Sequence, residues 1–492
     1  MSKINIKNLS FAYDNSPDDV FDHVTFFLDT DWKLGFTGRN GRGKTTFLNL
    51  LLGKYEYAGE IQTSVTFEYF PYEVSEVEKN TIDILMEIAP EAMEWEIDRE
   101  LSLLEVREDV LYRSFVTLSK GEQTKALLAA LFLKENCFLL IDEPTNHLDA
   151  KGREALGSYL NRKKGFILVS HDRALLDLCV DHILSINKTN IEIQKGNFSS
   201  WWENKRLQDQ FEIGQNEKLK KDISRLSEAA KRNASWSHQV ESSKFGVKNS
   251  GSKIDRGYVG HKAAKMMKRS KAVQGRQQAA VEEKSKLLHN IENEEKLTMF
   301  PLKYHSYHLV ELKDVALSYN GTAVCENVAF SIHQGDRISL CGKNGSGKSS
   351  LLKLILGEKI SFQGEVRLGA NLKISYVSQD TSHLRGTLSD YAKKLGIEEH
   401  IFKTVLRKMD FERSQFEKDM SDYSQGQKKK VLIAGSLCEK AHLYIWDEPL
   451  NYVDVISRVQ IEELLLQYQP TLLFVEHDIS FSRHVATEFI SL

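Results

Sequence analysis

The chain has 492 residues, 41% of them hydrophobic and 27% charged, which at about 150 residues per domain is enough for about three domains. Its 66 basic and 69 acidic residues give a net charge of −3, which excludes a uniformly basic nucleic-acid coat. No apolar run approaches the roughly 18 residues that cross a membrane, and the amino terminus lacks a signal-peptide layout, so we expect a cytoplasmic protein. Five scattered cysteines without a CxxC pair predict reduced thiols.

An internal repeat organises the chain. Landmarks of the first copy return about 305 residues later in the same order: Tyr13 and Tyr319, Gly38 and Gly342, Ser119 and Ser424, Glu143 and Glu448, His171 and His477. The separation varies by no more than about two residues, which chance does not produce. We therefore predict one domain over residues 1–202, a second copy of it over 302–492, and a different segment over 203–301.

Each copy predicts an α/β domain. An apolar strand at 32–38, or at 337–342, feeds a glycine-rich loop that is followed by apolar residues at helical spacing. Two further apolar runs in each copy predict buried strands: 137–141 and 165–169, then 443–446 and 471–475. Strands that alternate with helices in this way indicate a mainly parallel sheet.

The glycine-rich loops fit the phosphate-binding pattern GxxxxGK[ST]. In such loops backbone N–H groups surround the phosphates, the lysine reaches the terminal ones and the hydroxyl binds Mg²⁺. A single match is also compatible with an ordinary turn before a helix, but two matches in the same context favour nucleotide binding. The candidate ATP-binding residues are Gly38, Asn40, Gly41, Gly43, Lys44, Thr45, Thr46, Gly342, Asn344, Gly345, Gly347, Lys348, Ser349 and Ser350.

Two adjacent carboxylates end a buried strand in each copy, Asp142 with Glu143 and Asp447 with Glu448. Buried acids without a cation are costly, so a metal-bound nucleotide nearby is the economical explanation. The first acid suits the Mg²⁺ shell and the second suits the attacking water. Either acid alone is also compatible with a strand-end cap.

Together these motifs resemble the ATP-binding cassette (ABC) ATPases, whose signature matches Ser119 to Glu122 and Ser424 to Gln427. D-loop-like segments follow at 146–149 and 451–454. The resemblance implies two domains facing head to tail around two ATP molecules with Mg²⁺. It implies these roles: catalysis by Glu143, Glu448, His171 and His477; metal binding by Thr45, Asp142, Ser349, Gln379 and Asp447; ATP contacts from Ser119, Gly121, Glu122, Ser424, Gly426 and Gln427; and adenine stacking by Tyr13 and Tyr319, although packing also explains those tyrosines.

The sequence departs from the family pattern at three positions. Gln379 matches the metal-facing glutamine of the family, whereas the aligned position of the first copy is Tyr72, which cannot replace an amide at Mg²⁺. Lys120 and Gln425 replace the first signature glycine. Lys120 either places a cation near a γ-phosphate or is simply solvated.

The segment at 203–301 predicts a long α-helical hairpin with an irregular, glycine-containing tip near 242–258. Residues 231–276 hold twelve basic and two acidic side chains, a local net charge of +10, with aromatic residues among them. This composition favours nucleic-acid binding, while a solvated face is the alternative. The candidate rRNA-binding residues are Lys244, Phe245, Lys248, Lys253, Arg256, Lys262, Lys265, Lys268 and Arg269.

Twin cassettes with a basic hairpin resemble the ABC-F proteins, which act on ribosomes. The stretches 11–15, 38–44, 267–271 and 445–452 resemble the Lsa-type antibiotic-resistance proteins. That resemblance implies a monomer that binds the bacterial 70S ribosome at the tRNA exit site, beside 23S rRNA and P-site tRNA. It further implies that the hairpin dislodges lincosamides, pleuromutilins and streptogramin A drugs.

Two other classes fit less well. A fused double ATPase that powers a membrane importer has a similar length, but would be expected to have larger cassettes and a short joint. DNA-repair cassette ATPases generally carry zinc CxxC modules or very long coiled coils, and the sequence contains neither.

Overall fold

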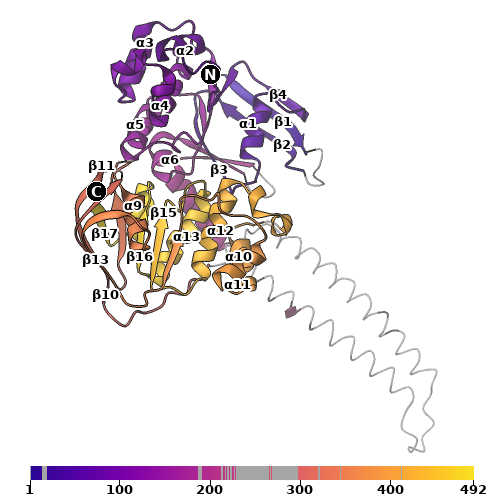
Figure 1. Ribbon diagram of the computed structural model, residues 1–492. Helices are drawn as coiled ribbons and strands as arrows, with labels where there is room; N and C mark the ends of the chain where they lie inside the picture. Colours follow the sequence, from indigo (N-terminus) through magenta and orange to yellow (C-terminus); the bar gives the residue numbers. More distant parts are fainter. Residues whose placement is uncertain are drawn as a thin grey trace, which may run out of the picture. The chain divides into compact units, whose positions relative to one another are not determined.

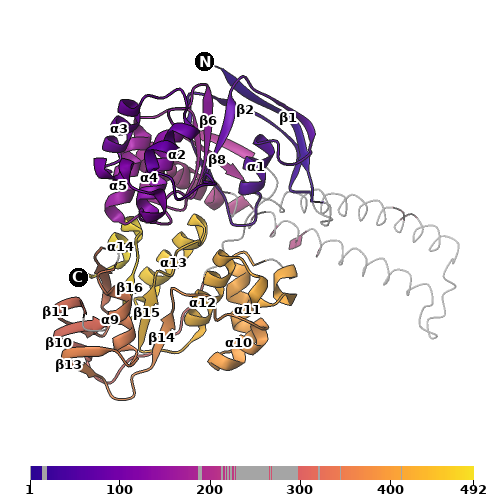
Figure 2. The ribbon, with the colours of Figure 1, turned by 45° about the horizontal axis from the view of Figure 1, so that its top comes forward.

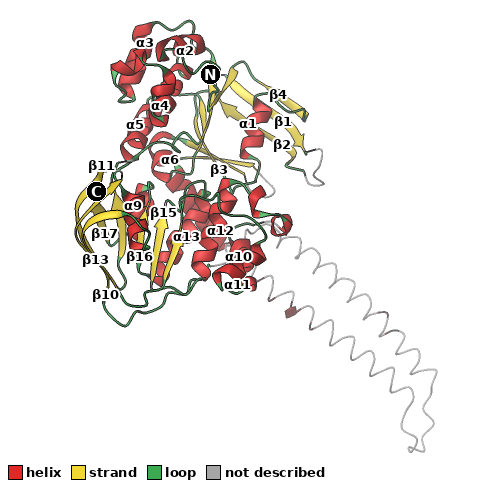
Figure 3. Cartoon of the chain, viewed as in Figure 1, coloured by secondary structure: helices red, strands yellow, loops and turns green. Residues whose placement is uncertain are grey.

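The computed structural model describes residues 2–13, 19–186, 191–211, 297–319, 322–343, 345–411 and 413–492. It also describes single helical positions at 214, 215, 218, 221, 224, 225, 228, 265 and 268. The chain divides into two units, Met1–Trp201 with Glu294–Leu492, and Trp202–Asn293. The first unit contains two α/β cassettes (Figures 1 and 3), as the repeat predicts.

The first cassette contains two sheets. A six-stranded sheet has the order β5-β6-β7-β3-β8-β9, and its strands are parallel except for β9, which pairs antiparallel with β8. A separate antiparallel sheet has the order β2-β1-β4. The strand bounds are β1 Lys3–Phe11, β2 Phe21–Asp29, β3 Lys33–Thr37, β4 Ala58–Gln62, β5 Thr66–Phe70, β6 Cys137–Asp142, β7 Phe166–Val169, β8 His182–Ile186 and β9 Ile191–Lys195.

The helices of the first cassette lie on both sides of its larger sheet. Figure 2 shows α1 with β1 and β2 on one side and α2 to α5 gathered on the other. Side chains of β1 and α1 pack in one buried cluster with side chains of β6 and β7. This packing is possible because β6 and β7 carry apolar side chains on both of their faces. The helix bounds are α1 Lys44–Leu51, α2 Thr81–Ile88, α3 Glu94–Leu103, α4 Lys120–Leu131, α5 Ala150–Asn161 and α6 Arg173–Cys179, with 3₁₀ turns η1 Glu108–Tyr112 and η2 Phe115–Thr117.

The second cassette repeats this plan. Its parallel sheet has the order β14-β15-β16-β12-β17 and its antiparallel sheet has the order β11-β10-β13. The strands are β10 His308–Tyr319, β11 Thr322–His333, β12 Arg337–Cys341, β13 Ser361–Leu368, β14 Ile374–Val377, β15 Leu443–Asp447, β16 Leu472–Val475 and β17 Glu488–Ser491. The helices are α9 Lys348–Ile355, α10 Leu388–Leu395, α11 Glu399–Lys408, α12 Gln425–Cys438, α13 Val455–Tyr468 and α14 Ile479–Val485, with turns η5 Arg413–Glu417 and η6 Met420–Asp422.

The predicted α/β class and the mainly parallel sheets are confirmed. Each predicted buried strand lies within one residue of its expected bounds, since continuous apolar runs between polar turns mark strands covered on both faces. The antiparallel sheet of each cassette was not specified by the sequence, because its strands are half-exposed and irregular. All five cysteines are unpaired thiols, as predicted.

The second unit, Trp202–Asn293, is described only in part. Residues 202–211 of this unit are helical. The predicted hairpin tip lies outside the described residues. Among the helices of the described residues, none is long and apolar enough to cross a membrane.

Candidate functional site

The two phosphate loops adopt the same geometry. Each joins the end of a central strand, β3 or β12, to the first turn of a helix, α1 or α9. Lys44 Nζ donates to the carbonyl oxygens of Gly38 at 2.6 Å and Arg39 at 3.1 Å. Lys348 Nζ donates to Gly342 and Lys343 at 2.8 and 2.9 Å. Both ammonium groups are therefore held inside the loop, where a nucleotide's phosphates would be bound.

Glycine is required where each loop enters its helix. Gly43 and Gly347 both have φ +90°, in the left-handed region that other residues rarely adopt. A Cβ atom would lie 2.6 Å from Val20 Cγ1 at Gly43 and 2.9 Å from Val324 Cγ1 at Gly347. These glycines directly precede α1 and α9. The N–H groups in the first turn of a helix are free to bind an anion.

The hydroxyl after each lysine meets the first carboxylate of its cassette. Thr45 Oγ1 donates to Asp142 Oδ2 at 3.3 Å, and Ser349 Oγ donates to Asp447 Oδ1 at 3.2 Å. Burial raises the pKa of both Asp142 and Asp447. A bound Mg²⁺ would remove this unfavourable burial of charge, because it needs oxygen ligands and favours the ionised carboxylate. The arrangement therefore fits the metal.

The second carboxylate of each pair faces the predicted catalytic histidine of its own cassette, His171 or His477, which we call the switch histidine. Glu143 Oε1 lies 3.4 Å from His171 Nε2, and Glu448 Oε1 lies 3.3 Å from His477 Nε2. Both glutamates have positive φ, 50° for Glu143 and 46° for Glu448, which is strained for a side-chain-bearing residue. In this backbone conformation each carboxylate lies beside the histidine of its own cassette.

The two glutamates differ in their surroundings. Glu448 Oε2 accepts hydrogen bonds from Gln379 Nε2 at 2.8 Å and from Asn451 Nδ2 at 2.7 Å. Burial alone would raise the pKa of Glu448, but the hydrogen bond and charge of His477 together with Lys429 lower it. In the first cassette, Glu143 Oε1 is buried without a hydrogen-bond partner among the described residues. Burial and the adjacent Asp142 charge raise the pKa of Glu143 to about 8.

The predicted Tyr72–Gln379 difference is accompanied by a contact that sequence reasoning missed. The strand registers place Tyr69 and Tyr376 at equivalent positions of β5 and β14. The Tyr69 hydroxyl donates to Asp142 Oδ2 at 3.1 Å, so Asp142 accepts from Thr45 and from this tyrosine. No equivalent bond joins Tyr376 to Asp447 in the described part of the second cassette. The sequence carries no signal that separates the two cassettes here, because a tyrosine occupies this position in both strands.

The signature segments form helix N-termini. Ser119 caps α4 and Ser424 caps α12, and each accepts from the N–H three residues on, at 3.2 and 3.3 Å. The side chains of Glu122 and Gln427 accept in return from the serine N–H groups, at 2.8 and 2.9 Å. Each reciprocal pair of hydrogen bonds is a capping box. Each segment thereby offers a helix end with backbone donors, a suitable partner for a terminal phosphate.

The phosphate loop of the first cassette meets the D loop and the signature of the second. Asn40 Nδ2 donates to the Tyr452 carbonyl at 2.9 Å, and a Cβ at Gly426 would lie 3.0 Å from Asn40 Nδ2. Arg42 Nη2 donates to Asp410 Oδ1 at 3.0 Å. We call this arrangement the first site. Its residues come together as the head-to-tail arrangement requires.

The second site combines the phosphate loop of the second cassette with the signature of the first. A cavity of about 1130 Å³ separates them. The signature of the first cassette and the phosphate loop and carboxylate region of the second line it: Ser119, Lys120, Gly121, Glu122, Lys343, Gly345, Gly347, Lys348, Ser349, Ser350, Gln379, Glu448, Asn451 and His477. Lys120 lines this cavity and donates to Gln123 Oε1 at 3.1 Å. Among the described residues, direct contacts therefore join the cassettes at the first site, and a cavity lies between them at the second.

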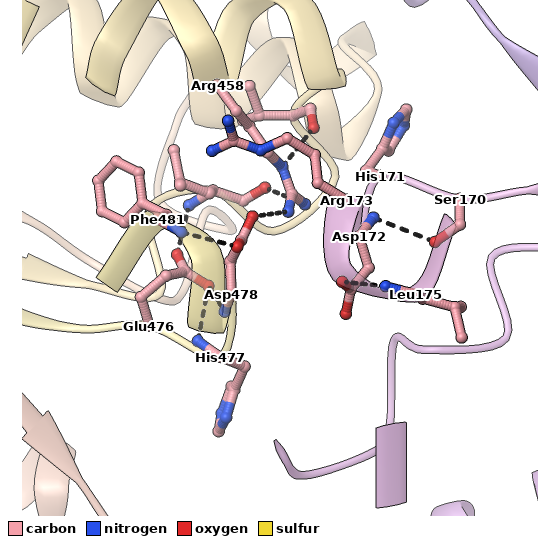
Figure 4. A network of polar contacts seen from close by, with 12 residues as sticks. Ser170, His171, Asp172, Arg173, Leu175, Arg458, Glu476, His477, Asp478 and Phe481 are labelled. Atoms are coloured by element: carbon pink, nitrogen blue, oxygen red, sulfur yellow. Dashed lines mark hydrogen bonds and ion pairs between the residues drawn. The ribbon is translucent and has the colours of Figure 1, made fainter. Parts of the chain in front are cut away.

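A further pair of residues was not predicted from sequence. Arg458, near the start of α13, donates from Nη1 to Asp478 Oδ2 at 3.2 Å and from Nε to the Val453 carbonyl at 2.9 Å. In the first cassette Arg153 makes the matching contacts to Asp172 and Leu148, at 3.2 and 3.1 Å. Figure 4 shows Arg458 beside Asp478, next to the switch residue His477.

A second charge contact between the cassettes joins α6 to α13. Arg173 of α6 pairs with Glu462 of α13, whose other oxygen lies 2.8 Å from His484 Nδ1. The positions that correspond to Arg173 and Glu462 in the opposite cassettes are Ile479 and Gly157. The contact between the cassettes is therefore asymmetric around the pseudo-twofold relationship of the repeat.

The remaining predicted residues are placed as follows. The Tyr13 hydroxyl is 2.7 Å from Thr46 Oγ1, and its ring is 43% exposed and packs edge-on against Phe11. Tyr319 ends β10. Asn344 lies outside the described residues. So do the candidate rRNA-binding residues other than Lys265 and Lys268, which are helical and exposed.

The fold and these sites define a P-loop ATPase with two cassettes. The ABC transporter family model matches residues 21–146 and 325–451, one stretch in each cassette. The chain therefore belongs to the ABC transporter family of ATPase domains. Double-cassette members hydrolyse ATP, so the chain is an ATPase.

The chain resembles individual proteins over nearly its whole length. It is 30% identical over 484 residues to the ribosome protection protein VmlR of Bacillus subtilis (strain 168), covering 96% of this chain and 83% of that protein. It is 27% identical over 521 residues to the ATP-binding protein Uup of Buchnera aphidicola (subsp. Acyrthosiphon pisum, strain APS), covering 99% and 80%. The crystal structure of the archaeal ribosome recycling factor aABCE1 shares the fold, with a TM-score of 0.63 and 18% identity over 98% of this chain and 87% of that one.

Proposed function

We propose that the chain is an ABC-F-type ATPase of the Lsa type that binds the bacterial 70S ribosome and protects it from drugs of the peptidyl-transferase centre. The drugs would be lincosamides, pleuromutilins and streptogramin A. The observation that carries the proposal is the 30% identity to a ribosome protection protein, which extends over 96% of this chain. The protein would act in the cytoplasm as a monomer with the domains 1–202, 203–301 and 302–492.

At each site the chain's own groups divide the work. Lys44 and Lys348 would bind the terminal phosphates, and Thr45 with Asp142, or Ser349 with Asp447, would hold Mg²⁺, which stabilises negative charge on the phosphates. Gln379 would face the metal at the second site.

Hydrolysis then needs a group that orients water. Glu143 or Glu448 would hold the attacking water, with His171 or His477 beside the carboxylate. The signature caps of the opposite cassette would complete the phosphate contacts, so both cassettes must approach each other for turnover.

The ribosomal part of the proposal concerns the segment 203–301. Its net positive tip would contact 23S rRNA near the exit site and P-site tRNA, through the nine candidate residues named above. The membrane-importer alternative is not favoured, because the similarity to a ribosome protection protein spans both cassettes and the segment between them.

Cosedimentation tests this function. Purified protein with ATP is layered with 70S ribosomes, with and without a lincosamide, and in parallel with membrane vesicles. The proposal expects the protein in the ribosomal fraction and rescue of drug-inhibited cell-free translation. Binding to vesicles but not to ribosomes would contradict it, and ribosome binding without rescue would remove the drug-protection part.

A further inference from the structure

Arg153 and Arg458 stand out because each contacts two segments that belong to different ATP sites. We propose that these arginines are positioning residues that couple the sites, each by tying the D loop that faces one site to the switch segment of the other. This coupling goes beyond the proposed ribosomal function and does not depend on it.

Arg458 contacts the switch segment of the second site, by which we mean His477 and the adjoining Asp478. Asp478 directly follows His477, whose ring contacts Glu448. Asp478 is fully buried, accepts from Arg458 Nη1 at 3.2 Å and caps α14 by accepting from Phe481 N at 2.9 Å. A shift of His477 toward or away from bound nucleotide would therefore move the carboxylate that holds Arg458 (Figure 4).

The other end is the D loop of the second cassette, which faces the first site. Arg458 Nε donates to the Val453 carbonyl and Nη2 donates to the Leu450 carbonyl, both at 2.9 Å. The neighbouring Tyr452 carbonyl accepts from Asn40 in the phosphate loop of the first cassette.

The first cassette contains the same connection in the opposite direction. Arg153 donates to the Leu148 carbonyl of its D loop, which lines the cavity of the second site. Its Nη1 donates to Asp172, next to His171 of the first site. Two independent copies thus place an arginine between the same two kinds of segment. A guanidinium suits this position, because its fixed fork of donors binds a carboxylate and carbonyls at once.

The experiment measures how the first site responds to occupancy of the second, with the full chain and without ribosomes. Glu448→Gln keeps ATP at the second site unhydrolysed, whereas Lys348→Ala weakens phosphate binding there, so turnover in both variants comes from the first site. The ratio of their turnover rates reports the coupling. With Arg458 intact we expect the two rates to differ at least about fivefold, in the range of ordinary allosteric coupling.

Adding Arg458→Gln to both variants should bring the ratio below about two. Arg458→Lys should give an intermediate ratio, since an ammonium cannot replace the three-donor fork. The matched control is Arg367→Gln, an exposed arginine of β13 that pairs with Glu365 and should leave the ratio unchanged. Asp478→Asn provides a second variant if Arg458→Gln does not fold, because asparagine still caps a helix.

The same design applies to Arg153. Lys44→Ala and Glu143→Gln replace the second-site variants, and turnover then comes from the second site.

A ratio that stays at its original value after Arg458→Gln or Asp478→Asn would show that Arg458 only stabilises the fold. A ratio near one with the arginines intact would also overturn the proposal.

Discussion

Glu143 and His171 lie 3.4 Å apart at the first site, and their counterparts Glu448 and His477 lie 3.3 Å apart at the second. The pKa of Glu143 is raised to about 8 by burial and by Asp142. At Glu448, contacts from His477, Lys429 and Gln379 outweigh burial and lower the pKa. Two pairs with the same spacing therefore differ in the protonation of the carboxylate.

This difference predicts that turnover depends on pH at the first site but not at the second. A raised pKa means that Glu143 is mostly protonated below pH 8, so first-site turnover should rise with pH up to about 8, by up to tenfold per unit at the acidic end. Phosphate release by the Glu448→Gln variant between pH 6 and 8.5 measures this. Second-site turnover in Glu143→Gln should stay nearly constant over the same range, and two flat profiles would contradict the prediction.

Replacing both glutamates with glutamine should leave ATP binding intact but abolish its hydrolysis. The lysines, hydroxyls and aspartates that contact phosphate and metal remain, while the groups that orient water are lost. We expect the Glu143→Gln, Glu448→Gln protein to accumulate on ribosomes in ATP, because the ATP-bound conformation persists. Equal ribosome occupancy of this variant and the wild type would argue against it.

Tyr69 should tune the metal site of the first cassette alone. Its hydroxyl bond to Asp142 is lost in Tyr69→Phe, which removes one donor to a buried carboxylate. We expect the Mg²⁺ concentration for half-maximal first-site turnover, measured in Glu448→Gln, to change by about tenfold, equivalent to about 1.4 kcal/mol. Tyr376→Phe is the matched control, measured in Glu143→Gln, and should change the second site less than twofold.

Ribosome binding should weaken as salt rises, because a basic segment releases counterions from RNA. Changing Lys262, Lys265, Lys268 and Arg269 to glutamine should reduce the slope of log affinity against log salt by up to about 3.6, at about 0.7 to 0.9 per phosphate contact. Filter binding at several KCl concentrations measures the slope. An unchanged slope would mean that these cations are only solvated.

Replacing Ser242 to Arg256 with a short Gly-Ser turn should separate ATP turnover from protection. Both ATP sites are built from cassette residues, so turnover should remain. Protection should fall, because Lys244 and Phe245 are removed and base stacking on an aromatic contributes about 1 to 3 kcal/mol. Cell-free translation with a lincosamide compares the two proteins, and full rescue by the shortened one would assign protection to other parts of the chain.

Much of each ATP site follows from short-range sequence alone. The lysine, the hydroxyl and the glycines of a phosphate loop lie within eight consecutive positions, so the strand, loop and helix fix their geometry locally. The carboxylate pairs follow directly from apolar strands that end at a sheet edge. The resemblance to ABC ATPases then implied which signature segment belongs opposite which loop.

The differences between the two sites were decided only by the tertiary structure. Tyr69 reaches Asp142 across 73 positions, and Arg173 reaches Glu462 across 289. Such contacts depend on how strands and helices pack, which residue spacing does not encode. Likewise, Glu143 and Glu448 are identical in sequence, but burial and neighbouring charges shift their pKa values in opposite directions, because the energy of a charge depends on all the atoms around it.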